Sequence, residues 1–279
     1  MPELPEVETV RRGVEDAVIG RRISEVNVLG RRTVRRQSPA ELRSRLLGRR
    51  LVSAGRRGKF LLLSLDDGAV LVVHLRMTGQ LLHVDGAERP PLAPHTHLTV
   101  DLDDGSELRF VDPRTFGEWF VSSDIDGRGV PAELEHIGRD PLLEGLPAAY
   151  LSERLAGRRA PLKALLTDQR IIAGIGSIYA DEICFRSKLR PDRLGGSLTA
   201  AELGSLAKAA RAVLGEAVKA RGSSLRDQRY RDVAGGLGSY QGRHAVYDRA
   251  GEPCPRCGKP VVRLKIGARS AYCCEECQL

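Results

Sequence analysis

The feature that most constrains this chain is a set of four cysteines near its C-terminal end. Cys254 and Cys257 are separated by two residues, as are Cys274 and Cys277, and 16 residues lie between the two pairs. Two tight turns that each present a pair of thiolates complete a closed tetrahedral zinc site. Such a segment is too small to have a core of its own, so the metal supplies its folding energy. The spacing predicts a zinc ribbon over residues 244–279.

Two disulfide bonds are the alternative use of these cysteines. The N-terminal sequence MPELPEVETVRRGVEDAV alternates acidic and basic residues and lacks the pattern of a secretory signal. We therefore expect the protein to stay in the cytoplasm, where thiols are reduced, which favours one structural Zn²⁺. Cys273 competes with Cys274 for the third ligand position, but equal two-residue gaps favour Cys274. Cys184 falls in a predicted helix, and we expect it to be a buried thiol.

The charge of the chain is unevenly distributed. Its net value is +8, with about +8 in residues 1–60, −7 in residues 61–130 and +7 in residues 131–279. Two basic stretches that flank an acidic one are expected if two lobes each offer a positive face to a phosphate backbone. A solvated Arg-rich surface is the alternative. No apolar run approaches the roughly 20 residues of a membrane span, which argues against a membrane protein.

One lysine stands out among the basic residues. Only 7 of the 44 basic residues are lysines, and Lys59 is the only one before Lys163. Unlike the guanidinium of arginine, an ammonium can change its pKa enough to donate or accept a proton. Lys59 is therefore a candidate for chemistry, although an ordinary lysine at a strand end is an equal alternative.

The N-terminal half shows two helix signals and several strand signals. A helix is expected from Pro5 to Ile19, with an apolar stripe on one face, and a short helix after Ser38, which caps it. Apolar segments joined by Asp-Gly turns predict two hairpins, and one more strand follows them. Together they indicate a β-rich domain of sandwich or barrel type. The predicted strands are residues 58–65, 69–75, 97–102, 106–112 and 116–121.

The C-terminal half is predicted to be helical. Helical patterns cover PLKALLTDQ, SIYADEICFRS and residues 199–220, where Thr199 and Glu202 form a capping box. Residues 221–243 are rich in Gly, Arg and Ser without apolar periodicity, which suggests a mobile loop that closes over a ligand, or a disordered connector. The stretch VVRLKIGARSAY between the cysteine pairs indicates a hairpin, and its basic residues suggest a nucleic-acid probe.

Six segments in order along the chain resemble the formamidopyrimidine-DNA glycosylase (Fpg/MutM) family. They are PELPEVETVRRG, RRGKFLLL, HLRMTGQL, DPRTFG, DQRIIAGIGSIYADE and the four-cysteine ribbon. The sister endonuclease VIII group usually has glycine where this chain has Leu4, which favours the formamidopyrimidine branch. The resemblance implies an α+β fold. Its expected parts are a β-sandwich catalytic domain over 1–130, a linker over 131–150, a helical helix-two-turn-helix domain with a lesion-capping loop over 151–243, and the zinc ribbon over 244–279.

The resemblance also implies a bifunctional DNA glycosylase and abasic-site lyase of the bacterial cytoplasm, acting as a monomer. Its expected partner is duplex DNA with oxidised purines (8-oxoguanine, formamidopyrimidines) or abasic sites. Removal of Met1 would leave Pro2 with a free amine, and α-amino groups titrate near about 7.7 to 8.0, so a neutral fraction exists. By resemblance Pro2 is the nucleophile that forms a Schiff base and drives β,δ-elimination, Glu3 the general acid and base, and Lys59 a second proton donor. Arg269 completes the implied catalytic set.

A base inside a duplex must be flipped out before it can react, and the stack needs something to fill the vacancy. Met77, Arg114 and Phe116 match the void-filling residues of the family. An apolar wedge, with an Arg that hydrogen-bonds the orphaned base, suits this task. The implied DNA-contact positions are His95, Arg114, Arg158, Lys163, Ser177, Tyr179 and Arg269.

Two departures from the family pattern concern DNA contacts. Ser177 stands where the family usually has asparagine, and its hydroxyl reaches less far, so one contact is expected to be lost or water-mediated. Backbone amides of the glycine-rich turn can still approach a phosphate at a helix N-terminus. Thr115 replaces a frequent basic residue after Arg114. These changes concern affinity more than reaction type.

Three other functions are alternatives to a glycosylase for oxidised purines. An endonuclease VIII-type enzyme for oxidised pyrimidines is disfavoured by Leu4 and by the void-filling set. A catalytically silent DNA-binding module is disfavoured because Pro2, Glu3 and Lys59 are all retained. An RNA-binding zinc protein would need stacking aromatics, and only 4% of the residues are aromatic.

Overall fold

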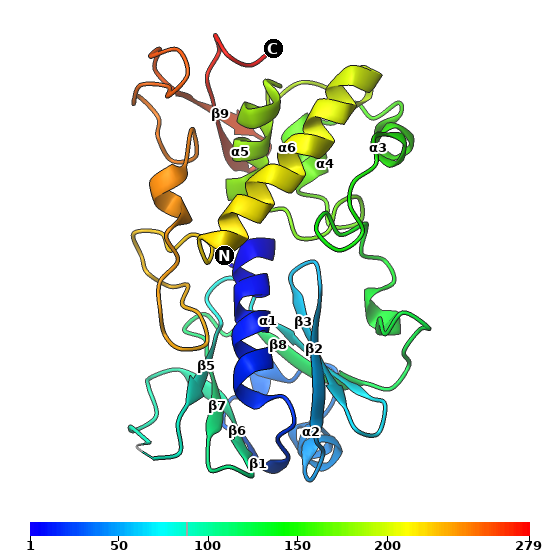
Figure 1. Ribbon diagram of the computed structural model, residues 1–279, viewed down its shortest axis with the longest axis vertical. Coiled ribbons are helices and arrows are strands. Elements are labelled where there is room, and N and C mark those ends of the chain that lie inside the picture. Colours follow the sequence, from blue (N-terminus) through cyan, green and yellow to red (C-terminus); the bar gives the residue numbers. More distant parts are fainter. Residues whose placement is uncertain (88) are drawn as a thin grey trace. The chain divides into compact units, whose positions relative to one another are not determined.

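The computed structural model describes residues 1–87 and 89–279, which form two compact units. The first unit contains Met1–Glu135 and Ala220–Ser239, and the second contains His136–Lys219 and Tyr240–Leu279 (Figure 1). The chain therefore leaves the first unit, returns to it after residue 219 and leaves it again after residue 239.

Two antiparallel four-stranded sheets build the first unit. One has the strand order β1-β6-β7-β5 and the other the order β2-β3-β4-β8. Apolar side chains of both sheets belong to one buried core, which makes this unit the predicted β-sandwich. The strands are β1 (Ile23–Val28), β2 (Leu51–Arg57), β3 (Phe60–Leu65), β4 (Val70–His74), β5 (Gln80–Val84), β6 (Thr96–Leu102), β7 (Glu107–Val111) and β8 (Glu118–Ser122).

The predicted hairpins are confirmed as β3-β4 and β6-β7, and the further strand as β8. Strands β1, β2 and β5 are additional to the prediction. Strand β2 contains serine and glycine, and β1 has two exposed or half-buried residues for each buried one, so neither shows the alternation of a half-buried strand. Pairing with β6 and β3 specifies these strands.

Helix α1 (Leu4–Val18) lies against strands β2 and β3 of the first unit (Figure 1). Its predicted stripe of Val7, Val10, Val14 and Val18 is buried in the sandwich core. Helix α2 (Pro39–Leu46) begins as predicted, because the Ser38 side chain accepts a hydrogen bond from the Glu41 backbone N–H at 3.1 Å. Short 3₁₀ turns are found at Arg31–Thr33 and Ala132–Leu134.

Residues 220–239 have no regular secondary structure, but they belong to the first unit. Tyr230 and Val233 enter the sandwich core, and the Val233 carbonyl accepts a hydrogen bond from the His83 N–H at 2.8 Å. The resemblance places this loop in the helical domain, and its composition suggests a mobile loop or a disordered connector. The structure differs, because these apolar contacts and backbone bonds hold the loop on the sandwich.

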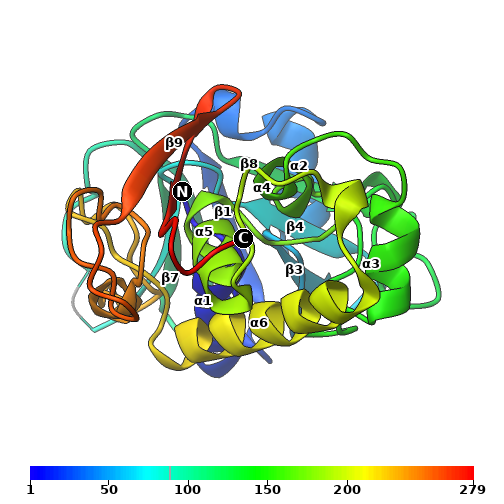
Figure 2. The ribbon, with the colours of Figure 1, turned by 90° about the horizontal axis from the view of Figure 1, so that it is seen from above.

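The second unit is built from helices and a small hairpin, with a capping box of Thr199 and Glu202 as predicted. Figure 2 shows its long helix α6 in yellow and the hairpin of β9 and β10 in red. Helix α5 packs on α6, on α4 and on strand β10. The elements are α3 (Ala148–Leu155), α4 (Leu162–Leu166), α5 (Ser177–Ser187), α6 (Ala200–Lys219), β9 (Val262–Ile266) and β10 (Arg269–Cys273), with 3₁₀ turns at Gly195–Ser197 and Tyr240–Arg243.

Candidate active site and zinc site

The predicted nucleophile lies directly before helix α1. Pro2 is buried, and Glu3 is the N-cap residue of the helix with an exposed fraction of only 2%. The Glu6 carboxylate fixes this segment by accepting the Glu3 backbone N–H at 2.8 Å and the Ser223 N–H at 2.7 Å. The Pro2 nitrogen is part of a peptide bond until Met1 is removed. Glu6, which sequence analysis leaves out, thus joins the start of α1 to the 220–239 loop.

Lys59 occupies the turn between strands β2 and β3. Its side chain is buried, and Gly58 beside it adopts a left-handed conformation with φ +55°. The hairpin is fixed against α1 by Arg56, whose Nε donates to the Glu8 carboxylate at 3.1 Å. Lys59 is therefore held on a rigid hairpin that packs against the helix carrying Glu3.

His74 is a buried residue of this region that sequence analysis does not predict. It pairs with Phe60 across β3 and β4, with ring centroids 4.4 Å apart. Burial holds its pKa well below the usual range, and the nearby charges of Arg76 and Lys59 lower it further. The neutral ring accepts the Arg76 N–H on Nδ1 at 2.8 Å. The pattern HLRMTGQL contains this residue, and its place beside Met77 is the signal that could have pointed to it.

The predicted void-filling residues lie on loops of the first unit. Met77 is 37% exposed and follows β4, and Phe116 is 42% exposed and follows β7. The exposed Arg114 guanidinium lies over the Phe116 ring, 4.9 Å from its centroid. His95 is exposed on the loop before β6. Large apolar side chains in such exposed positions are suited to contacts with a partner.

The predicted contact residues of helix α5 differ in exposure. Ser177 is the first residue of α5 and is partly exposed, whereas the Tyr179 side chain is fully buried near Tyr240. A direct DNA contact of the Tyr179 side chain is thus not available in this structure. Gln169 shapes the turn before α5, because its side chain bonds the Gly174 N–H and the Ile175 carbonyl, both at 2.8 Å. Arg158, in a separate loop, is exposed.

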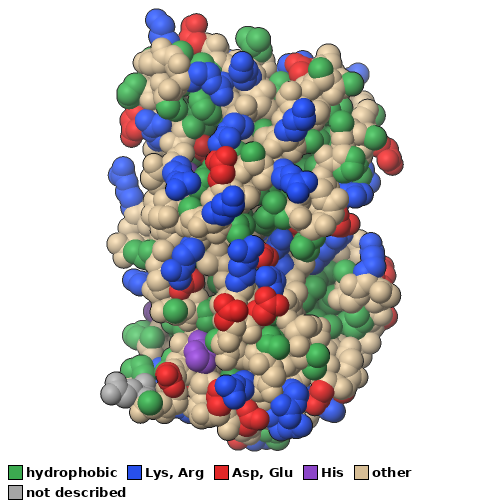
Figure 3. Space-filling view, viewed as in Figure 1, with side chains coloured by type: hydrophobic (Ala, Val, Ile, Leu, Met, Phe, Trp, Pro, Cys, Tyr) green, Lys and Arg blue, Asp and Glu red, His purple; other side chains and the backbone are tan. Residues whose placement is uncertain are grey.

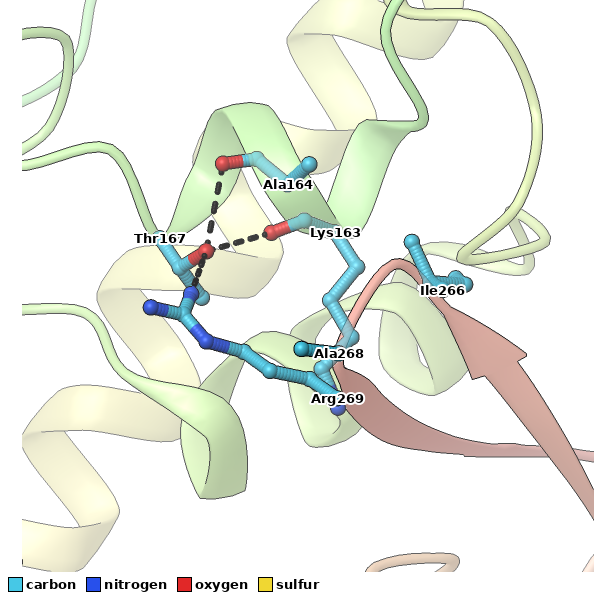
Figure 4. A pocket seen from close by; sticks show the side chains of 6 residues that line it. All are labelled: Lys163, Ala164, Thr167, Ile266, Ala268 and Arg269. Carbon is cyan, nitrogen blue, oxygen red and sulfur yellow. Dashed lines mark hydrogen bonds between the residues drawn. The ribbon is translucent and has the colours of Figure 1, made fainter.

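Lys163 and Arg269 line an apolar pocket of about 190 Å³ between α4 and the hairpin (Figure 4). Arg269 reaches across it to the Thr167 hydroxyl at 2.8 Å. Lys163 is 1% exposed, and its Nζ contacts Asp181 at 2.7 Å and the Ser270 carbonyl at 2.6 Å. The Lys163 ammonium is buried and bound to protein groups in this structure, and its direct contact with DNA stays a prediction.

The four predicted zinc ligands come together at the C-terminal end. The sulfur atoms of Cys254, Cys257, Cys274 and Cys277 all lie within 4.8 Å of one another. Two Sγ–Sγ distances are 3.9 and 3.4 Å, close to the ~3.8 Å expected for thiolates about 2.3 Å from a tetrahedral Zn²⁺. Cys273 is excluded from the cluster as predicted, and burial raises its pKa to about 12. None of the six cysteines forms a disulfide bond, so the four clustered thiols are available to hold one structural zinc ion.

Two adjacent acids of helix α5 attach the ribbon to the helices. Burial raises the pKa of Asp181 to about 7 despite the opposing charge of Lys163, and Asp181 accepts the Tyr272 N–H of strand β10 at 3.2 Å. Glu182 accepts three consecutive backbone N–H groups, those of residues 245–247, at 2.9 to 3.0 Å. Burial also raises the pKa of Glu182. Asp181 thus fixes the Arg269 hairpin to α5, and Glu182 fixes the segment 245–247 at the start of the ribbon.

Figure 3 shows Lys and Arg side chains scattered over one face of the molecule, interspersed with acidic side chains. Many arginines of the chain are paired with acids, for example Arg43 with Glu25 at 2.8 Å and Arg186 with Glu216 at 2.8 Å. Such pairing makes these arginines less available for a phosphate, while the net charge of +8 is unchanged. Within residues 1–87 and 89–279, no helix is long and apolar enough to cross a membrane.

Comparison with known proteins gives matches along the whole chain. Residues 1–119 match the family model "Formamidopyrimidine-DNA glycosylase N-terminal domain", residues 137–229 the corresponding H2TH domain, and residues 251–279 a zinc finger found in FPG and IleRS. A formamidopyrimidine-DNA glycosylase of Pelotomaculum thermopropionicum is 42% identical over 100% of this chain and 99% of its own.

Two solved structures extend the comparison. The MutM (FPG) protein of Thermus thermophilus has a TM-score of 0.86 and 41% identity, covering 99% of this chain and 98% of its own. The Lactococcus lactis Fpg, solved with DNA containing an abasic site, has a TM-score of 0.88 and 30% identity, covering 99% of both chains. With the α+β fold and the zinc cluster already in place, these matches show that the chain belongs to the formamidopyrimidine-DNA glycosylase family.

Proposed function

We propose that this protein excises oxidised purines, such as 8-oxoguanine and formamidopyrimidines, from duplex DNA and then cleaves the resulting abasic site. The observation that carries the proposal is Pro2 placed directly before the buried Glu3 at the start of α1, in a chain that matches a DNA-bound glycosylase over 99% of its length. We further propose that it acts as a monomer in the bacterial cytoplasm, which the bacterial origin of the relatives supports.

The chemistry begins when removal of Met1 frees the Pro2 nitrogen. The amine lone pair attacks the sugar C1′ of the damaged nucleotide, the bond from C1′ to the base breaks, and the base leaves with a proton. Opening of the sugar ring leaves an iminium between Pro2 and C1′. Loss of a proton from C2′ then expels the 3′ phosphate, and a second elimination expels the 5′ phosphate. Water hydrolyses the remaining iminium, which releases the sugar fragment as an aldehyde and returns the Pro2 amine.

Three residues move protons or stabilise charge in these steps. Glu3 acts as the general acid and base at the sugar, and Lys59 acts as a second proton donor from its fixed hairpin turn. Arg269 supplies positive charge to a phosphate, from a hairpin that Asp181 holds on α5. Lys163 serves the same purpose indirectly, by its ion pair with Asp181.

The DNA contacts are assigned to exposed residues of both units. Met77, Arg114 and Phe116 fill the space that the flipped base leaves, and Arg114 hydrogen-bonds the orphaned base. His95 and Arg158 contact phosphates. Ser177 adds a hydroxyl to the backbone amides at the N-terminus of α5.

Borohydride trapping tests the mechanism. The purified protein is mixed with duplexes that contain 8-oxoguanine, an oxidised pyrimidine or an abasic site, reduced with borohydride, and mapped by peptide mass spectrometry. We expect a covalent adduct on Pro2 with the purine lesion and the abasic site. The matched variants are Lys59→Gln and Lys219→Gln, since Lys219 is exposed at the end of α6. Only the first should slow strand cleavage.

Other outcomes identify the rival functions. A preference for the oxidised pyrimidine would indicate an endonuclease VIII-type enzyme. Tight binding without any adduct would indicate a silent DNA-binding protein. Trapping through Lys59 with Pro2 unmodified would overturn the assigned nucleophile.

A further inference from the structure

The turns that carry Met77, His95 and Arg114 converge on one buried carboxylate. Asp112 follows strand β7 and has no exposed surface. Its Oδ2 accepts the Gly117 N–H at 2.7 Å, and its Oδ1 accepts the hydroxyl of Thr78 at 2.5 Å. A buried carboxylate that is satisfied by several donors fixes the backbone around it.

Thr78 connects the two turns that carry the void-filling residues. Its Oγ donates to Asp112 and also accepts the Arg114 N–H at 3.2 Å. Thr78 is 2% exposed, whereas the adjacent Met77 is 37% exposed. One hydroxyl therefore ties the backbone beside Met77 to the backbone of Arg114.

The backbone of Asp112 extends the same arrangement to a third turn. Its N–H donates to the carbonyl of His95 at 3.0 Å, and its carbonyl accepts the Thr115 N–H at 3.1 Å. Both His95 and Thr115 have a left-handed backbone, with φ of +67° and +54°. Such conformations persist only where surrounding contacts over-determine them, and Asp112 provides a contact for each.

The packing around Gly117 confirms how little freedom these turns have. A Cβ at Gly117 would lie 2.3 Å from the Phe110 ring and 3.1 Å from the Asp112 carboxylate. The turn from Asp112 to Gly117 is thus held between the sandwich core and the carboxylate, and Phe116 is directed outward from a fixed backbone.

We infer that Thr78 and Asp112 form a positioning clamp that sets the Met77 turn against the Arg114–Phe116 turn. The clamp thereby determines how the side chains of these turns insert into the DNA duplex and which base is selected opposite the lesion. The inference rests on the proposed void-filling role of Met77, Arg114 and Phe116, and adds the residues that hold them. Neither clamp residue touches the reacting atoms. Both act through Met77, Arg114 and Phe116, the three side chains that would enter the DNA duplex.

Thr78→Val tests the clamp, because it keeps the shape of the side chain and removes the hydroxyl. Single-turnover excision is measured with 8-oxoguanine opposite C and opposite A, and stopped-flow fluorescence of a 2-aminopurine beside the lesion reports distortion of the duplex. We expect Thr78→Val to slow excision opposite C by about tenfold, because misplaced positioning residues lower the rate of the reaction. The C-over-A ratio and the fluorescence change should fall with it, while cleavage of a preformed abasic site changes less than about twofold.

Three variants separate positioning from general destabilisation. Thr78→Ser restores the hydroxyl and should recover the ratio. In an Asp112→Asn background, Thr78→Val should have no further effect, since coupled residues are not additive. Ser106→Ala removes a bond of 2.7 Å to Asp104 in the turn between β6 and β7. It is the matched control, and should lower thermal stability without changing the ratio.

The outcomes also separate this inference from the proposed function. If Met77→Ala and Phe116→Ala change the fluorescence and the ratio but Thr78→Val does not, the clamp is wrong and the void-filling assignment stands. If Thr78→Val and Ser106→Ala lower the ratio equally, the effect is general destabilisation and the clamp is again wrong. If none of the void-filling variants has an effect, that assignment fails, and the clamp fails with it.

Discussion

The β-sandwich and the zinc ribbon are stabilised in different ways. In the sandwich, apolar side chains from both sheets, helix α1 and the 220–239 loop share one large core. Among the described residues, the fully buried members of the ribbon cluster are Phe185, Val246, Cys254, Val261, Tyr272 and Cys274. Two of these are zinc ligands and one belongs to α5. Hydrophobic burial is therefore sufficient for the sandwich, whereas the ribbon depends on its metal and on the buried acids of α5.

The largest expected effect is that of losing a zinc ligand. Structural zinc contributes about 10 to 16 kcal/mol in small zinc modules, so Cys254→Ser should release the metal and unfold the ribbon. DNA affinity should fall with it, while the sandwich keeps its own unfolding transition. Metal analysis, calorimetry and DNA titration measure these effects. Cys273→Ser is the control, because this buried thiol lies outside the cluster. Full DNA binding by metal-free protein would contradict the dependence.

The buried ion pair of the second unit gives the next largest effect. Lys163→Met leaves the Asp181 carboxylate buried without its cation, which costs about 3 to 5 kcal/mol. The double variant with Asp181→Asn should recover part of this loss. Hydrogen exchange resolved along the chain should show the change in the second unit only. If Lys163→Met weakens DNA binding at unchanged stability, Lys163 contacts phosphate directly, as the resemblance implies.

The two units also differ in how their stability depends on pH. Burial lowers the pKa of His244 in the second unit from 6.5 to about 4. The unfolded chain thus binds a proton that the folded one rejects, so this stability is complete above pH 6.5 and is lost as the pH falls toward 4. Between pH 7.5 and 5 the loss is about 2 kcal/mol. His244→Asn should remove this part of the pH dependence, measured by urea unfolding. The sandwich, with its own buried His74, should keep its acid sensitivity in that variant.

The smallest effect concerns Ser177 at the start of α5. If backbone amides make the main contacts with the phosphate, Ser177→Ala should cost only about 1 kcal/mol of DNA-binding free energy, the value of one neutral hydrogen bond. Ser177→Asn should tighten binding to lesion and undamaged duplexes alike, because phosphate contacts do not read bases. Binding at several salt concentrations measures the phosphate contribution. A changed preference among lesions, or complete loss of binding in Ser177→Ala, would assign the serine a different role.

The sequence predicts the parts of this fold that depend on local signals. The stripe of helix α1, the Ser38 cap, the Asp-Gly hairpins and the cysteine spacing all act over a few residues, and all are found in the structure. Strands β1 and β2 are specified by partners far along the chain, so their own residues carry little pattern.

In the candidate site, too, features set by local sequence can be predicted and features set by distant partners cannot. Met77 and Phe116 are exposed on loops, and their void-filling role stays a prediction. The burial of Lys163 cannot be predicted from sequence, since its partners are Asp181, 18 residues away, and Ser270, 107 residues away. The roles of Asp112 and Glu6 cannot be predicted from sequence either, because both carboxylates act through backbone groups that the fold brings to them.

The return of residues 220–239 to the first unit has a consequence for synthesis on the ribosome. Glu6 emerges early, but the Ser223 N–H that it binds is made 217 residues later, and Tyr230 and Val233 of the core follow after that. The N-terminal unit therefore cannot be completed while the chain is short, although domains generally fold as units in order of synthesis. A nascent chain stopped at residue 135 has every strand of the sandwich and lacks the segment that closes its core.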